Sequence, residues 1–113
     1  MDVTPSDLLR AHVERFNEGI RSGDFAPMVS GFATDAVMAF EGVEVGPFIG
    51  RDAIAQAYAD QPPTDEIRLL GALTAEGDAV ESDYAWAAEG SQAGRMIVTA
   101  RDGAIARLTV TFE

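Results

Sequence analysis

The chain has 113 residues, a net charge of −11 and no cysteine. Its hydrophobic fraction of 47% and charged fraction of 24% indicate a globular protein, and its length fits one domain over residues 1–113. The negative charge disfavours nucleic acid and anionic membranes as partners. Without cysteine there are no disulfides or thiolate metal sites, and no apolar run approaches a membrane span of about 20 residues. We therefore expect a cytoplasmic protein without a metal or cofactor.

The first predicted element is an amphipathic helix that ends at Gly23. Thr4 is a good N-cap, Pro5 suits the first helical position, and Asp7 completes a pattern like a capping box. Apolar residues then recur at helical spacing and define one buried stripe. These residues are Leu9, Val13, Phe16 and Ile20. A second, shorter helix is expected over residues 25–29.

From residue 33 to residue 41 the pattern changes to period two, which predicts a strand. One face carries Ala36, Met38 and Phe40, and the other carries Val37, Ala39 and Glu41. Because both faces are largely apolar, we expect this strand to be covered on both sides or to meet a partner chain. A glycine-rich loop follows, and residues 51–60 form a third helix that buries Ile54, Ala57 and Tyr58 and ends at two prolines.

The rest of the chain predicts an antiparallel meander. Its strands cover about residues 66–75, 79–89, 94–101 and 104–113, and the Asp102-Gly103 pair is a strong hairpin signal. Helices followed by a meander favour an α+β fold, with the helices packed on one face of a curved sheet.

Two segments, RFNEGIRSGDFAPMVSGFATDAVMAFEG and IGRDAIAQAY, together with the four strands, resemble the nuclear transport factor 2-like superfamily. Ketosteroid isomerase and the SnoaL-like polyketide cyclases belong to it. The resemblance covers nearly the whole chain. It implies a cone-shaped α+β fold, in which a curved antiparallel or mixed sheet wraps around a long N-terminal helix and two short helices. It also implies a deep apolar pocket and a homodimer. The reaction stays open, because this fold hosts both enzymes and non-catalytic domains.

The same resemblance argues against ketosteroid isomerase activity. The catalytic tyrosine of the isomerase corresponds to Phe16, its aspartate base to Phe40, and its second acid to Ile97. None of these side chains can donate or accept a proton. Tyr58 matches a supporting tyrosine of the isomerase pocket.

The strand predicted over residues 79–89 adds aromatic residues to the expected pocket. Glu81 and Asp83 belong on the outer face, so alternation points Tyr84 and Trp86 into the cone. The predicted pocket residues are Phe16, Met38, Phe40, Tyr58, Tyr84, Trp86 and Ile97. The alternative is that these side chains simply fill a core, as aromatic residues at strand spacing usually do.

Three residues are candidates for catalysis: His12, Glu41 and Tyr58. His12 is the only histidine, and an imidazole suits proton transfer near neutral pH, although a surface or half-buried position is commoner for a helix histidine. Regular alternation places Glu41 outside the cone, whereas a β-bulge would turn it inward. Tyr58 or Tyr84 would polarise a carbonyl group.

Two functional hypotheses follow. The first is a protein with an apolar pocket for a small hydrophobic molecule, such as a polyketide or terpenoid, with cofactor-independent proton transfer. The second is a non-catalytic binding or dimerisation module whose cone is filled by its own aromatic side chains. In either case we expect a homodimer that contacts through the apolar outer face of the sheet. The residues assigned to this face are Val37, Ala39, Ala85, Ala87, Met96 and Val98.

Overall fold

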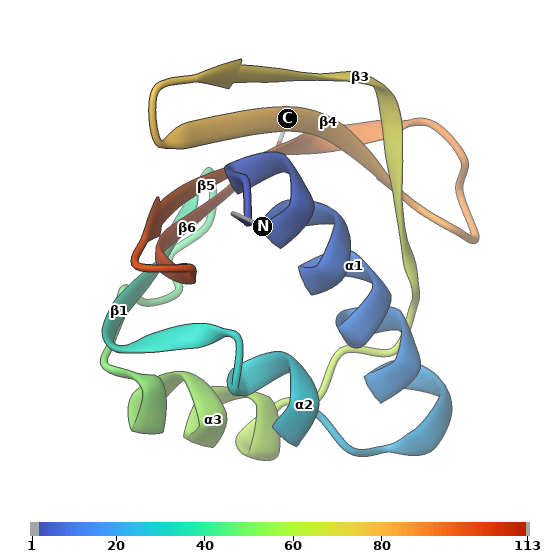
Figure 1. Ribbon diagram of the computed structural model, residues 1–113. Helices are drawn as coiled ribbons and strands as arrows, with labels where there is room; N and C mark the ends of the chain where they lie inside the picture. Colours follow the sequence, from blue (N-terminus) through green and yellow to red (C-terminus); the bar gives the residue numbers. More distant parts are fainter. Residues whose placement is uncertain (1–2, 113) are drawn as a thin grey trace.

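The computed structural model describes residues 3–112 and shows a curved, unclosed sheet wrapped around one long helix (Figure 1). The elements are α1 (Pro5–Ser22), α2 (Ala26–Val29), β1 (Phe32–Glu41), β2 (Phe48–Ile49), α3 (Arg51–Asp60), β3 (Ile67–Glu76), β4 (Ala79–Trp86), β5 (Gln92–Arg101) and β6 (Ala104–Thr111). The predicted α+β fold is therefore confirmed, although the predicted end of the last strand at residue 113 lies outside the described residues.

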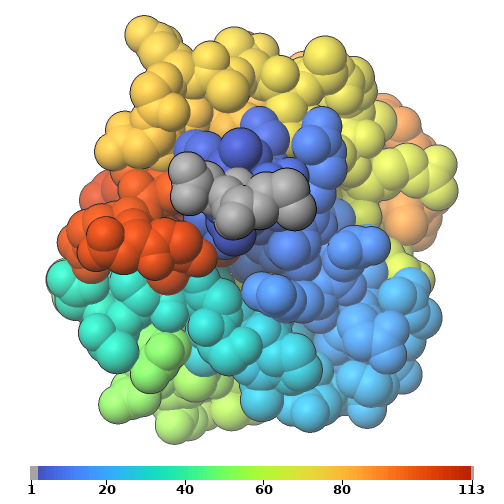
Figure 2. Space-filling view, in the orientation of Figure 1, coloured from blue at the N-terminus to red at the C-terminus, as the bar shows by residue number. Residues whose placement is uncertain are grey.

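Helix α1 begins and ends as its sequence predicts. The Oγ1 atom of Thr4 accepts a hydrogen bond of 3.1 Å from the Asp7 amide, and the Asp7 carboxylate accepts one of 3.2 Å from the Thr4 amide. This capping box satisfies two amides that the first turn leaves unpaired. Gly23 ends the helix with φ 82°, a conformation that glycine adopts without steric cost. In the space-filling view the atoms of α1 lie between those of β3 and those of α2 (Figure 2).

The six strands lie in the order β2-β1-β6-β5-β4-β3. Strands β3 to β6 form the predicted antiparallel meander, and β1 pairs with β6 in parallel. Asp102 and Gly103 both have positive φ, 53° and 77°, as expected for a two-residue hairpin turn. The parallel pair places the first long strand beside the last one, so both ends of the chain contribute to the concave face.

One predicted register is wrong by a single residue in β5. Met96 and Val98 are buried on the concave face, and Ile97 between them is half-buried on the outer face. The expectation that Met96 and Val98 lie outside is therefore incorrect. All three side chains are apolar, so alternation alone cannot decide which of them face the core.

A side-chain amide joins helix α1 to the start of β3. Asn17 donates from Nδ2 to the Ile67 carbonyl oxygen at 2.9 Å, and its Oδ1 atom accepts from the Ile67 amide at 2.8 Å. An ion pair of 2.6 Å between Arg21 and Glu66 lies beside these hydrogen bonds. The start of β3, at the edge of the sheet, is therefore fixed to α1. Within residues 3–112, no helix has the length and apolar character needed to cross a membrane.

Candidate functional site

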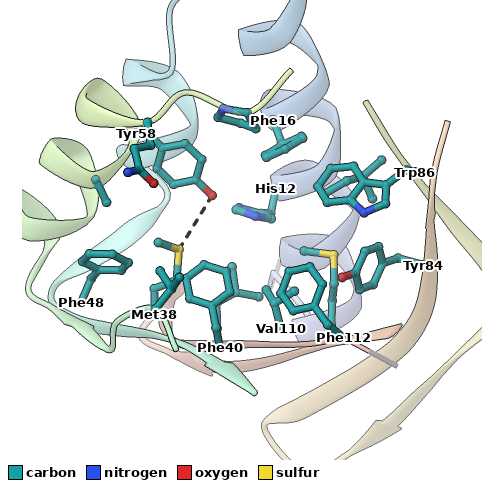
Figure 3. Close-up of a pocket in the computed structure, with 17 residues that line it drawn as sticks. His12, Phe16, Met38, Phe40, Phe48, Tyr58, Tyr84, Trp86, Val110 and Phe112 are labelled. Atoms are coloured by element: carbon teal, nitrogen blue, oxygen red, sulfur yellow. Dashed lines mark hydrogen bonds between the residues drawn. The ribbon is translucent and has the colours of Figure 1, made fainter. Parts of the chain in front are cut away.

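A cavity of about 170 Å³ lies between helices α1 and α3 and the concave face of the sheet (Figure 3). Its walls come from every strand and from two helices. The lining residues are His12, Phe16, Met38, Phe40, Val45, Phe48, Ala57, Tyr58, Gln61, Pro63, Ile67, Tyr84, Trp86, Met96, Leu108, Val110 and Phe112. None of the lining residues within the described chain is charged.

The periodicity of each element explains why these side chains converge. His12 and Phe16 are four residues apart on α1, so they lie one above the other on the same face of the helix. Tyr84 and Trp86 are two residues apart on β4, where alternation sends both to the concave face. Tyr58 approaches from α3 on the opposite side of the cavity (Figure 3).

The cavity reaches the surface beside the loop that follows β1. Val45 and Gln61 both line it and are both exposed. Val45 belongs to the loop between β1 and β2, and Gln61 directly follows α3. The opening of the cavity to the surface therefore lies between these two segments.

His12 lies in the cavity wall and is only 2% exposed, so the expectation of a surface or half-buried histidine is wrong. Its ring meets that of Phe32 edge to face, with centroids 5.5 Å apart. Its Nδ1 atom is buried without a hydrogen-bond partner among the described residues. Burial, with a smaller contribution from the charge of Arg15, lowers the pKa of His12 to about 4. The imidazole is therefore neutral at pH 7.

Tyr58 presents a hydroxyl group with one weak partner. Its oxygen lies 3.8 Å from the Sδ atom of Met38, and a thioether is a poor hydrogen-bond acceptor. The Tyr58 ring packs against Phe25 and Phe16, with centroid distances of 5.2 and 6.3 Å. Burial raises the pKa of Tyr58, so the phenol stays protonated. In Figure 3 its hydroxyl points into the cavity on the side facing His12.

Tyr84 and Trp86 form the opposite wall. The Tyr84 hydroxyl donates a hydrogen bond of 3.0 Å to the Thr111 carbonyl oxygen, so this group is already engaged. The rings of Tyr84 and Trp86 meet edge to face at 6.0 Å. Of the two tyrosines predicted to polarise a carbonyl, Tyr58 is therefore the one with a hydroxyl available to a bound molecule.

Most of the residues predicted for the pocket line the cavity, and two candidates do not. The residues brought together are His12, Phe16, Met38, Phe40, Tyr58, Tyr84 and Trp86. Ile97 points to the outer face, and Met96 takes its place in the wall. Glu41 is exposed and outside the cavity, because the register of β1 is regular from Val37 to Glu41, after a shift that lies earlier in the strand. The proposals for Ile97 and Glu41 at the site are therefore corrected.

The sequence interpretation missed part of the wall. Leu108, Val110 and Phe112 all line the cavity from the end of the chain. Their spacing of two residues is the signal that could have identified them. The ring of Phe112 stacks on that of Phe40 at 6.2 Å, across the parallel pair of β1 and β6. That long-range pairing is what brings the two rings together.

A family model described as a SnoaL-like domain matches residues 13–108. The chain belongs to the SnoaL-like family. None of the curated proteins matches it. Among solved structures, a protein from Sphaerobacter thermophilus is 23% identical, with a TM-score of 0.73 and coverage of 99% of this chain and 98% of that one.

Two further structures resemble this SnoaL-like chain. A proposed polyketide cyclase from Xanthomonas campestris pv. campestris is 25% identical, with a TM-score of 0.68 and coverage of 96% and 90% of the two chains. A proposed ketosteroid isomerase from Kribbella flavida is 14% identical, with a TM-score of 0.66 and coverage of 95% and 78%. At 14% identity the likeness establishes the fold and not the reaction.

The lining of this SnoaL-like cavity limits its chemistry. By the resemblance, Phe40 stands at the position of the isomerase base and Phe16 at that of its catalytic tyrosine. Both rings lie in the cavity wall. Within residues 3–112 no group of three potential metal ligands comes together. The ionisable side chains that do line the cavity are His12, Tyr58 and Tyr84.

Proposed function

We propose that this protein binds a small, largely apolar molecule in the cavity and transfers a proton on it without a cofactor. One observation carries the proposal. The Tyr58 hydroxyl and the His12 imidazole border the same apolar cavity, and neither has a good partner of its own: Tyr58 has a thioether at 3.8 Å, and Nδ1 of His12 has none among residues 3–112. Buried polar groups are normally hydrogen-bonded, so a ligand is a suitable partner for the Tyr58 hydroxyl, which points into the cavity (Figure 3).

Tyr58 is suited to stabilise negative charge on an oxygen atom. Its phenol remains protonated because burial raises its pKa, and its hydrogen bond to the Met38 sulfur costs little to exchange. A donor placed where charge develops in the transition state lowers the barrier, especially where water is excluded. A ligand carbonyl beside Tyr58 would gain this stabilisation as it becomes an enolate.

His12 is suited to carry the proton. One ring nitrogen takes a proton from the carbon next to the carbonyl. The electron pair of that C–H bond forms the new C=C bond, and the π pair of the C=O bond moves to oxygen to give the enolate held by Tyr58. Return of the proton to the same carbon gives exchange, and return to a conjugated carbon gives an isomer. With a pKa of about 4, the neutral imidazole has about the basicity of an ordinary carboxylate.

Exchange of hydrogen for deuterium tests the proposal. We expect the protein to speed deuterium incorporation next to the carbonyl of 1-indanone in D₂O, as followed by proton NMR. His12→Gln should lower the accelerated rate by about 10²- to 10⁴-fold, the usual contribution of a general base. Glu41→Gln is the matched control, because this exposed carboxylate lies outside the cavity, and it should leave the rate unchanged.

The second candidate function is ligand binding without catalysis. It is favoured by the lack of any carboxylate among the described lining residues, because the imidazolium formed at His12 would be buried without a counter-charge. Binding of indanone with no acceleration of exchange in the wild-type protein would support this alternative. Loss of exchange in Glu41→Gln but not in His12→Gln would contradict the proposed assignment of the base.

A further inference from the structure

We infer that the ligand is a neutral molecule of one or two fused rings whose carbonyl oxygen accepts a hydrogen bond from Tyr58. This inference rests on the proposed function and specifies the class of molecule that the cavity takes. Four properties of the cavity lead to it: its volume, the absence of charge in its lining, the hydrogen-bond donors of Tyr58 and Trp86, and its aromatic walls.

The volume limits the number of rings. The cavity holds about 170 Å³, close to the 150 Å³ or so of an engineered apolar cavity that binds benzene. Pockets for drug-sized ligands usually enclose about 300–1,000 Å³. A single ring or two fused rings fit the smaller space, whereas a rigid four-ring skeleton would have to displace wall residues such as Phe40 or Trp86.

The lining selects against charge. No Asp, Glu or Arg is among the described residues that border the cavity, and the chain has no lysine. His12 is neutral, since burial lowers its pKa to about 4. An ionised ligand would therefore lose its hydration without gaining an opposite charge, which weakens its binding. An anion would also be repelled by the field of a protein with net charge −11.

The polar groups of the lining favour an acceptor on the ligand. The Tyr58 hydroxyl has only the Met38 thioether as its partner, and the indole N–H of Trp86 can only donate. The Tyr84 hydroxyl is already committed to the Thr111 carbonyl oxygen. A ketone provides a hydrogen-bond acceptor for Tyr58 and has no donor of its own that would need an acceptor in the wall. A hydrocarbon leaves the phenol with its weak contact to sulfur.

The aromatic walls favour a flat ring. Phe40 stacks with Phe112 at an interplanar angle of 29°, and Trp86 lies edge-on to Tyr84 at 88°. The labelled side chains leave a space bounded by these rings on the sheet side and by Tyr58 on the other side (Figure 3). A planar ring can lie along the stacked pair and still place its carbonyl next to Tyr58.

Four matched probes test the inference through the fluorescence of Trp86, the only tryptophan, with isothermal titration as a second readout. The probes are 1-indanone, indane without the oxygen, the anion indane-1-carboxylate, and a four-ring 3-ketosteroid. We expect indanone to bind about 3- to 10-fold more tightly than indane, the range of one net hydrogen bond. The carboxylate and the steroid should bind at least about tenfold more weakly than indanone.

A pair of variants isolates the hydroxyl group. Tyr58→Phe should bind indane as tightly as the wild-type protein does. Its affinity for indanone should fall to the same value, because the donor to the carbonyl oxygen is lost. Ser82→Ala is the control, because it removes a buried hydroxyl that lies outside the cavity lining and donates to the Asp83 carbonyl oxygen, and it should keep the preference for indanone.

The outcomes separate the two proposals. Equal affinity for indane and indanone in the wild-type protein would overturn the carbonyl inference and leave the binding cavity standing. Tighter binding of the carboxylate or the steroid would overturn the limits on charge or size in the same way. Failure of both neutral bicyclic probes to bind would contradict the proposed function together with the inference.

Discussion

The Tyr58 hydroxyl meets the Sδ atom of Met38 at 3.8 Å, whereas the Tyr84 hydroxyl donates to the Thr111 carbonyl oxygen at 3.0 Å. The same substitution should therefore have different effects on stability. Tyr58→Phe should change the free energy of unfolding by less than about 1 kcal/mol, and Tyr84→Phe should lower it by about 1–3 kcal/mol, because a carbonyl loses its donor. Urea unfolding of both variants measures the difference. A larger loss in Tyr58→Phe would mean that its hydroxyl has a stronger partner than sulfur.

The burial of His12 should make stability depend on pH. Because burial lowers its pKa from 6.5 to about 4, the unfolded chain binds the proton more tightly than the folded one. Stability should therefore be complete above pH 6.5 and fall as the pH drops from 6.5 to about 4, by about 3 kcal/mol in all. Unfolding midpoints at several pH values should show a shallower slope in His12→Gln. Identical slopes would show that the imidazole is not desolvated.

Ketosteroid isomerase activity should be negligible. Phe16 and Phe40 line the cavity at the stations of the isomerase tyrosine and base, and Met96, another residue that cannot transfer a proton, lies in the wall where Ile97 was expected. Loss of the base at its isomerase position costs about 10²- to 10⁴-fold of rate. The proposed base, His12, does not replace it, because a cavity of about 170 Å³ does not admit the four-ring substrate. A spectrophotometric assay with a β,γ-unsaturated 3-ketosteroid tests this, and turnover above that of a His12→Gln control would contradict it.

Trp86 should report on the cavity. Its ring is half-buried in the wall beside Tyr84, so its emission should lie at shorter wavelength than that of a tryptophan in water. Indanone should change the emission, whereas unfolding in urea should move it to the value for water. A spectrum that already matches exposed tryptophan in the native protein would place the ring outside the cone.

We propose that two copies associate through the outer face of the sheet. With the β5 register corrected, the centre of this outer face is a row of residues across β5, β6 and β1. In this row Ile97 pairs with Thr109, and Thr109 pairs with Ala39. Ile97→Arg should turn a dimer into a monomer in sedimentation experiments at micromolar concentration, because it places a charge in a desolvated contact. A wild-type protein that sediments only as a monomer would exclude this interface.

Local sequence signals predicted the helices, strands and turns well. Contacts between residues distant in the chain decide which side chains face the cavity. The capping box at Thr4 and the Asp102-Gly103 turn are local, so the sequence alone identified them. The side on which Met96 or Ile97 lies depends on pairing with strands distant in the chain, and both residues are apolar. His12 borders the apolar stripe of α1, and only the sheet that covers it makes it a buried residue.

The two hydrogen bonds between the Asn17 side chain and the Ile67 backbone affect how two copies of the chain can associate. An edge strand with free amides and carbonyls can recruit a strand from another chain. At the start of β3, however, the Asn17 side chain occupies both backbone groups of Ile67. Further along, the pairing of β3 with β4 shifts between Leu70 and Thr74, which interrupts the regular edge. The opposite edge strand, β2, has only two residues. Both rims of the sheet are therefore poor templates for aggregation, and self-association is left to the faces.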